Sequence, residues 1–114
     1  MPKGNDAARR ATIRELNDAF RNTLSGGRVM MTAGVAALPD RDRAEAVRKV
    51  QAFDAFSPDN DPHGEHDFGA FDSAGEKFFW KMDYFDRTLH FGSDDPSNPE
   101  ITTRVLTIML VEEY

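Results

Sequence analysis

The sequence predicts an α+β fold, in which about three α-helices flank an antiparallel sheet of three or four strands arranged as a β-meander. Helical spacing of apolar residues dominates the first half of the chain, and strand-like alternation dominates the second half. A length of 114 residues with 39% hydrophobic residues suits one domain with a buried core. We therefore expect a single domain over residues 1–114, with a frayed N-terminus over residues 1–5.

The first helix is expected over residues 6–24, because apolar side chains recur there at spacings of three and four. These side chains are Ile13, Leu16, Phe20 and Leu24. The polar residues between them, which include Asp18 and Arg21, are expected to form a solvated face. The glycine pair at 26–27 ends this helix, since glycine tolerates the left-handed conformation of a helix C-terminus.

A short strand over residues 28–32 follows, and a second helix is expected over residues 40–53. The second half of the chain then predicts three strands over residues 66–72, 76–85 and 88–91, joined by tight turns. Alternation separates a core face of these strands from an outer face. The expected core face carries Phe68, Ala70, Phe78, Trp80, Met82, Tyr84, Leu89 and Phe91.

The segment 99–113 has two open interpretations. A helix is favoured, because Asn98 before Pro99 is typical of a helix start and apolar residues nearly encircle the segment. A β-strand is the rival, since the segment is rich in the β-branched residues Thr, Val and Ile. A helix that is apolar on most sides packs in a core or at an interface, so a homodimer is among the expectations.

Composition and charge exclude several classes of function. The chain has no Cys, which rules out disulfides, thiolate nucleophiles and Cys-ligated zinc and fits a cytoplasmic location. A net charge of −6 and a pI of about 4.9 argue against direct nucleic-acid binding and permit a basic protein partner. No apolar run is long enough to span a membrane, and the N-terminus lacks the apolar segment of a signal peptide.

The densest collection of chemically active side chains lies in residues 59–69. Its candidate metal ligands are Asp59, Asp61, His63, Glu65, His66 and Asp67. Imidazole and carboxylate groups suit a divalent metal ion such as zinc, iron or manganese, so a metal-dependent hydrolase is one interpretation. An EF-hand is disfavoured, because Ala70 stands where a calcium loop needs its bidentate Glu. The rival interpretation is a structural turn without a cofactor, in which Asp side chains bond the backbone.

A charged row is expected on the outer face of the sheet. The predicted register sets Asp83 opposite His90, and Asp67 opposite Lys81. Cross-strand pairs of opposite charge commonly stabilise a sheet, by roughly 0.2–1 kcal/mol each. The same groups in a cleft could carry out acid–base chemistry, so Lys81, Asp83 and His90 are a candidate functional surface.

Several segments of the chain together resemble one known family. They are Asp59-Asn60-Asp61-Pro62, Gly64-Glu65-His66-Asp67-Phe68-Gly69, Phe79-Trp80-Lys81 and Thr103-Arg104-Val105-Leu106-Thr107-Ile108-Met109-Leu110. This pattern is similar to that of small bacterial proteins catalogued as domain of unknown function 3768, and the likeness spans residues 17–114. The resemblance implies a bacterial, cytoplasmic protein, often encoded on plasmids and other mobile elements. It implies no catalytic residue.

No motif for nucleophilic catalysis or for phosphate binding by a glycine-rich loop is present in the sequence. Together with the negative charge and the resemblance, this favours a non-enzymatic regulatory module whose acidic surface binds a protein partner. Such a module would be an accessory factor of a mobile element or an inhibitor of a nucleic-acid-binding machine. The alternative is the metal-dependent hydrolase, with the 59–67 loop as its site.

Overall fold

The computed structural model describes residues 3–114, with side chains described from Asp6 onward. Its elements in chain order are α1 (Lys3–Thr23), β1 (Arg28–Met31), α2 (Ala33–Ala36), α3 (Asp40–Gln51), β2 (Phe68–Ser73), β3 (Glu76–Phe85), β4 (Thr103–Leu110) and the 3-10 turn η1 (Val111–Glu113). Of the residues expected to fray, Met1 and Pro2 lie outside the described part of the chain, and residues 3–5 belong to α1.

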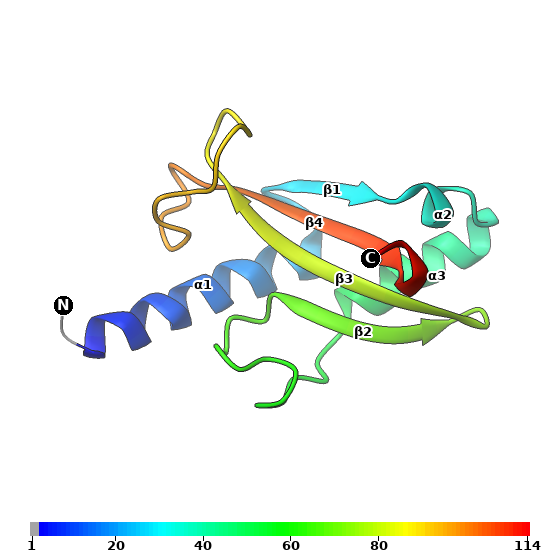
Figure 1. Cartoon of the computed structure of the whole chain (residues 1–114), viewed down its shortest axis with the longest axis horizontal. Helices are drawn as coiled ribbons and strands as arrows, with labels where there is room; N and C mark the ends of the chain where they lie inside the picture. The colour runs from blue at the N-terminus through cyan, green and yellow to red at the C-terminus, as the bar shows by residue number, and fades with distance from the viewer. Residues whose placement is uncertain (1–2) are drawn as a thin grey trace.

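The four strands form one sheet in the order β1-β4-β3-β2. The pairs β2–β3 and β3–β4 are antiparallel, whereas β1 pairs in parallel with β4. Figure 1 shows α1 and α3 on one side of this sheet, behind it in that view. The predicted α+β class, with four strands and three α-helices, is confirmed. The sheet is therefore mixed rather than purely antiparallel. A parallel pair requires a long crossover connection, and residues 32–102 supply it between β1 and β4.

The expected helix over residues 99–113 is wrong, and the rival strand is right. Asn98 does start a hydrogen-bonded turn: its Oδ1 accepts from the Glu100 N–H at 3.0 Å, and its carbonyl accepts from the Ile101 N–H at 3.3 Å. The turn ends there, and β4 begins at Thr103. β4 lies between two strands, where β-branched side chains pack well.

The expected strand over residues 88–91 is also wrong, because these residues form a turn. The Oδ1 atom of Asp86 accepts hydrogen bonds from the backbone N–H groups of Thr88 at 3.0 Å and of His90 at 3.3 Å. The Asp86 N–H donates to the carbonyl of Phe91 at 2.8 Å. An Asp that bonds nearby backbone in this way favours a turn over a strand. β3 therefore pairs with β4, which completes the predicted meander.

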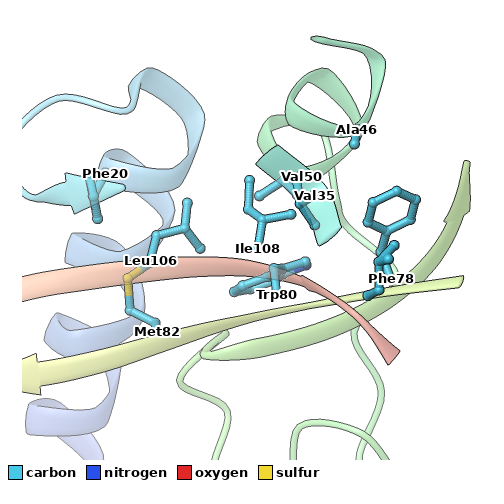
Figure 2. Packing of buried hydrophobic residues seen from close by; sticks show 10 residues of the cluster. Phe20, Val35, Ala46, Val50, Phe78, Trp80, Met82, Leu106 and Ile108 are labelled. Atoms are coloured by element: carbon cyan, nitrogen blue, oxygen red, sulfur yellow. The ribbon is translucent and has the colours of Figure 1, made fainter. Parts of the chain in front are cut away.

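The core lies between the helices and the inner face of β3 and β4. Trp80 and Ile108 face each other across these strands, and both are fully buried. Figure 2 shows Phe20 of α1 near Leu106 at one end of this cluster, Val50 of α3 in its middle, and Ala46 of α3 toward the end where Phe78 lies. Each large apolar side chain buried in this way contributes about 1.5–3 kcal/mol to stability, so this cluster holds the two layers together.

The residues of β2 that face the core are shifted by one position from the prediction. Gly69 lies opposite Trp80 and is buried, so its neighbours Phe68 and Ala70 lie on the outer face instead of the core face. Gly69 is required there, because a Cβ atom would collide with the indole nitrogen of Trp80. The absent side chain makes room for the largest residue of the core, and the predicted inner face of β3 is correct.

Across residues 3–114, none of the helices combines the length and the apolar character that crossing a membrane requires.

Candidate functional site

The 59–67 loop is a structured turn organised by Asp61. The Asp61 N–H donates to the carbonyl of Ser57 at 2.8 Å, and the Asp61 carbonyl accepts from the Gly64 N–H at 3.1 Å. The Asp61 carboxylate is buried and accepts the backbone N–H of His66 at 3.2 and 3.3 Å. Loss of these partners would leave a buried carboxylate unsatisfied, which is costly, so the loop keeps this shape.

The imidazole of His66 connects this loop to α1. Its Nδ1 atom lies 2.9 and 3.0 Å from the two carboxylate oxygens of Asp18, and its Nε2 atom lies 3.7 Å from Oδ2 of Asp61. The ring stacks on Phe56, with centroids 3.7 Å apart and planes 3° apart. The backbone φ angle of His66 is 56°, a conformation that costs a non-glycine residue about 1 kcal/mol or more. The ring contacts hold the residue in this disfavoured conformation.

Asp18 also accepts a hydrogen bond from Arg21, which extends the connection to α3. Arg21 is 3% exposed, and its Nη1 donates to the carbonyls of Val50 and Phe53, both at 2.9 Å. Its Nη2 donates to Oδ1 of Asp18 at 3.1 Å. A buried guanidinium needs both a counter-charge and hydrogen-bond acceptors, and these groups supply them. The result is a continuous polar chain from Arg21 through Asp18 to His66.

A second polar network lies one helical turn before Arg21. Asn17 is fully buried, and its Nδ2 donates to the Tyr84 hydroxyl at 2.8 Å and to the Glu65 carbonyl at 3.0 Å. Its Oδ1 accepts from Nε of Arg104 at 2.7 Å. Burial raises the pKa of Tyr84 well above its ordinary value and lowers the pKa of Arg104. We call the two networks together the α1–loop junction.

The structure divides the six candidate metal ligands. Two of them, Asp61 and His66, lie together. The Asp61 carboxylate accepts the backbone N–H of His66, and the His66 ring lies 3.7 Å from the same carboxylate. Asp59 and His63 are exposed at the loop surface. Burial, and then the nearby charge of Glu65, raise the pKa of Asp67. Among the side chains that the structure describes, no three His, Asp or Glu groups are arranged to hold a metal ion. The metal site stays a prediction.

The charged row expected on the outer face is not assembled in the predicted register. Asp83 lies opposite a residue of β4, whereas His90 is exposed in the turn that follows β3. Lys81 lies opposite Phe68, one position away from Asp67. Lys81 and Asp83 do form an ion pair of 3.1 Å, with both side chains about two-fifths exposed. Exposed pairs of this kind contribute about 0–1 kcal/mol, so this pair is a surface feature.

The connection between β3 and β4 presents apolar side chains to solvent. Phe91 is 73% exposed, Ile101 is 41% exposed and Leu89 is 36% exposed. The connection is nevertheless held by hydrogen bonds. The hydroxyls of Ser93 and Thr102 lie 2.7 Å apart, and the Asp86 carboxylate accepts the backbone N–H of Thr88. Leu89 has a φ angle of 63°, so the turn holds a strained residue in place. An exposed aromatic ring on a fixed turn is a candidate contact point for a partner.

The buried and half-buried polar residues of α1 are the positions that the sequence prediction missed. Asp18 and Arg21 were expected on the solvated face, yet they bond to the loop and to α3. Arg14 and Asn17 precede them at helical spacing, and Nη1 of Arg14 donates to the carbonyl of Gly64 at 3.0 Å. Positions 14, 17, 18 and 21 therefore form one polar stripe beside the apolar stripe. A polar stripe at spacings of three and four beside an apolar stripe is the sequence pattern that could have indicated a helix face bonded to the backbone of other segments.

The fold and the junction define a two-layer α+β protein, with helices on one face of a mixed four-stranded sheet. The sequence model of one family, described as Protein of unknown function (DUF3768), matches residues 31–113. The chain belongs to this family. Searches among curated proteins and among solved structures found no match. The matched span begins at the last residue of β1, so α1, which supplies half of the junction, lies before it.

Proposed function

We propose that this chain is a non-enzymatic regulatory module that binds a protein partner through the β3–β4 connection. The observation that carries the proposal is the 73% exposure of Phe91 on a turn fixed by hydrogen bonds. Aromatic side chains that fill a pocket of the partner supply much of the binding energy at protein interfaces. A turn that is already ordered loses little conformational entropy on binding, which favours this ring as the anchor.

The charge of the connection indicates the chemistry of the partner. Its acidic residues are Asp86, Asp94, Asp95 and Glu100. Arg87 is the single Lys or Arg residue between β3 and β4, and His90 lies in the same segment. Complementary charge steers association and excludes wrong partners, so the partner has an apolar pocket bordered by Lys and Arg.

The biological setting of the proposal follows from this partner chemistry. Basic surfaces are typical of machines that bind nucleic acids. We therefore assign the chain to the cytoplasm of a bacterium, as an accessory factor of a mobile element or as an inhibitor of such a machine. Direct nucleic-acid binding is not part of the proposal, because the net charge of −6 repels phosphate over most of the surface.

The test compares the wild type with Phe91→Ala and with Tyr114→Ala as a matched control. Tyr114 is also an exposed aromatic residue, at 76%, but it follows η1 at the opposite end of β4 from the connection. Proteins retained from an extract of the source cells are identified, and the strongest binder is purified for calorimetry with each variant. Melting temperatures of the free variants show that both are folded.

Phe91→Ala is expected to weaken the Kd by about 30-fold, as at an interface hot spot, while Tyr114→Ala leaves it unchanged. Added salt is expected to weaken binding further, because charge contributes to association. Equal affinity of the wild type and Phe91→Ala would contradict the proposed surface. Absence of any specific binder from the extract would contradict the proposed function as a whole.

A further inference from the structure

A cleft of about 480 Å³ lies between the end of α1, the glycine loop that follows it and the start of β4. Arg28, Arg87 and Arg104 line this cleft, together with small, hydroxyl-bearing and apolar residues. None of the described residues that line it is an Asp or a Glu. In a chain with 20 acidic and 14 basic residues, a cleft lined by arginines and by no described carboxylate is locally electropositive.

The three guanidinium groups make no direct ion pair with the described carboxylates, although the charge of Glu65 acts on Arg104 from a greater distance. Among the described side chains, none of them lies within ion-pair distance of a carboxylate. Arg104 is 4% exposed, and its bonds go to neutral acceptors, the side-chain oxygen of Asn17 and the carbonyl of Pro96. A buried cation without a counter-ion is costly. The carbonyl end of α1 supplies only about half a negative charge, so positive charge remains in the cleft.

The backbone beside these arginines leaves room for a ligand. Gly26 has a φ angle of 100°, and no atom lies within 4 Å of the place where its Cβ would stand. Gly27 packs tightly on its other side, since a Cβ there would lie 2.6 Å from the carbonyl oxygen of Arg104. The open position at Gly26 lets a ligand approach the main chain closely, as glycines do at sites for charged groups.

We propose that this cleft binds a small phosphorylated molecule through the exposed guanidinium groups of Arg28 and Arg87. The planar fork of a guanidinium matches two phosphate oxygens at once. The volume of the cleft falls within the usual range of small-molecule sites, about 300–1,000 Å³. The two exposed guanidinium groups suit a ligand group with two negative charges. Because Arg87 belongs to the β3–β4 connection, a bound ligand also steadies the turn that displays Phe91.

The experiment uses the full chain with pyrophosphate and inorganic phosphate as probes, and citrate as a polyanion of carboxylates. Calorimetry and thermal shift measure binding to the wild type, Arg28→Gln and Arg87→Gln. Both arginines are exposed, so the free variants are expected to keep the wild-type melting temperature. Arg41→Gln is the matched control, because Arg41 is an exposed arginine on α3 outside the cleft.

Pyrophosphate is expected to bind and to raise the melting temperature, and each cleft variant is expected to weaken binding about tenfold. Arg41→Gln is expected to bind like the wild type. Absence of binding at millimolar pyrophosphate would overturn the site. Equal weakening by Arg41→Gln would show attraction by overall charge and overturn it as well. Binding of citrate as strong as that of pyrophosphate would overturn the assignment to phosphate.

Discussion

The Nδ1 atom of His66 lies 2.9 Å from Oδ1 of Asp18, although 48 residues separate the two positions in the chain. This contact joins α1 directly to the loop that leads into β2. The imidazole is stacked on Phe56 on one side of the contact, and the carboxylate also accepts from Arg21 on the other. The pair is therefore the centre of the α1–loop junction, and its loss is expected to loosen the helix and the loop together.

Replacement of His66 by Ala is expected to destabilise the protein by about 1–3 kcal/mol, because a hydrogen bond to a charged carboxylate and a ring stack are lost together. The measurement is the free energy of unfolding from urea titration. His63→Ala is the control, since His63 is exposed in the same loop and its loss is expected to change stability by less than about 0.5 kcal/mol. Equal effects of the two substitutions would contradict the junction.

Replacement of Asp67 by Asn is expected to stabilise the protein at pH 7. Burial and the charge of Glu65 raise the pKa of Asp67, so the ionised carboxylate costs stability in the folded state. This cost is present above the folded pKa and fades as the pH falls toward the unfolded value of 3.8. The melting temperature of the variant should exceed that of the wild type at pH 7, and the gap should narrow near pH 4.

Asp59→Asn serves as the control for that measurement, because Asp59 is an exposed carboxylate of the same loop. It is expected to leave the melting temperature nearly unchanged at both pH values. A lower melting temperature of Asp67→Asn at pH 7 would show that the Asp67 carboxylate supports the fold instead of straining it.

Glu113→Gln is expected to lower the melting temperature at pH 7. The Glu113 carboxylate accepts hydrogen bonds from the Thr32 hydroxyl, from the Gly34 N–H at 2.8 Å and from the Leu110 N–H at 3.1 Å. These bonds hold the pKa of Glu113 below its ordinary value of 4.5, the bond from Thr32 most strongly. The ionised group therefore stabilises the fold above pH 4.5, and this stability is lost as the pH falls through the lower folded pKa.

The difference between Glu113→Gln and the wild type should accordingly shrink in a melting series taken from pH 7 down to pH 3. Glu112→Gln is the matched control, because Glu112 is exposed in the same 3-10 turn. A gap that stays constant across the series would rule out the ionised carboxylate as the source of the stabilisation.

Gly27→Ala is expected to destabilise the protein by about 1–3 kcal/mol, as other insertions into packed sites do. The new Cβ would lie 2.6 Å from the carbonyl oxygen of Arg104 and 2.7 Å from the ring of Phe20. Gly92→Ala is the control, because the nearest atom to its Cβ would be the carbonyl oxygen of Tyr84 at 3.8 Å. Chemical denaturation of both variants checks the expectation, and equal midpoints would contradict it.

The parts of the fold that could be predicted are those with a strong local period. The apolar residues of α1 recur every three or four positions, and those of β3 recur every second position. Both patterns are visible in the sequence because the residues that share a face lie close together in the chain. β4 could not be assigned in this way. Its outward positions carry Val105 and Met109 as well as threonines, so apolar residues follow one another without clean alternation, as they do in a buried helix segment. Asn98 added to the ambiguity, since the side chain that caps a helix also closes a turn.

The candidate site was predictable in part for a similar reason. The structure places the 59–67 loop in a turn in which Asp61 bonds nearby backbone, and this role of Asp61 follows from local chemistry. The partners Asp18 and Arg21 were missed, because the groups that bond to them lie far away in the sequence. A polar residue on a helix is expected to be exposed. Only the packing of a distant segment against the helix changes that expectation, and such packing is not visible in the local sequence.

The strand order has a consequence for how the chain reaches its folded state. β4 is the last of the four strands to be synthesised, yet it lies between β1 and β3, and Arg28 finds its partner only at Val105. Until residues 103–110 have been made, β1 has no neighbour and the meander lacks its third member. Loop closure over so long a separation slows folding. A nascent chain therefore exposes unpaired strand edges for most of its synthesis, and chaperones that bind such edges are expected to matter for its yield.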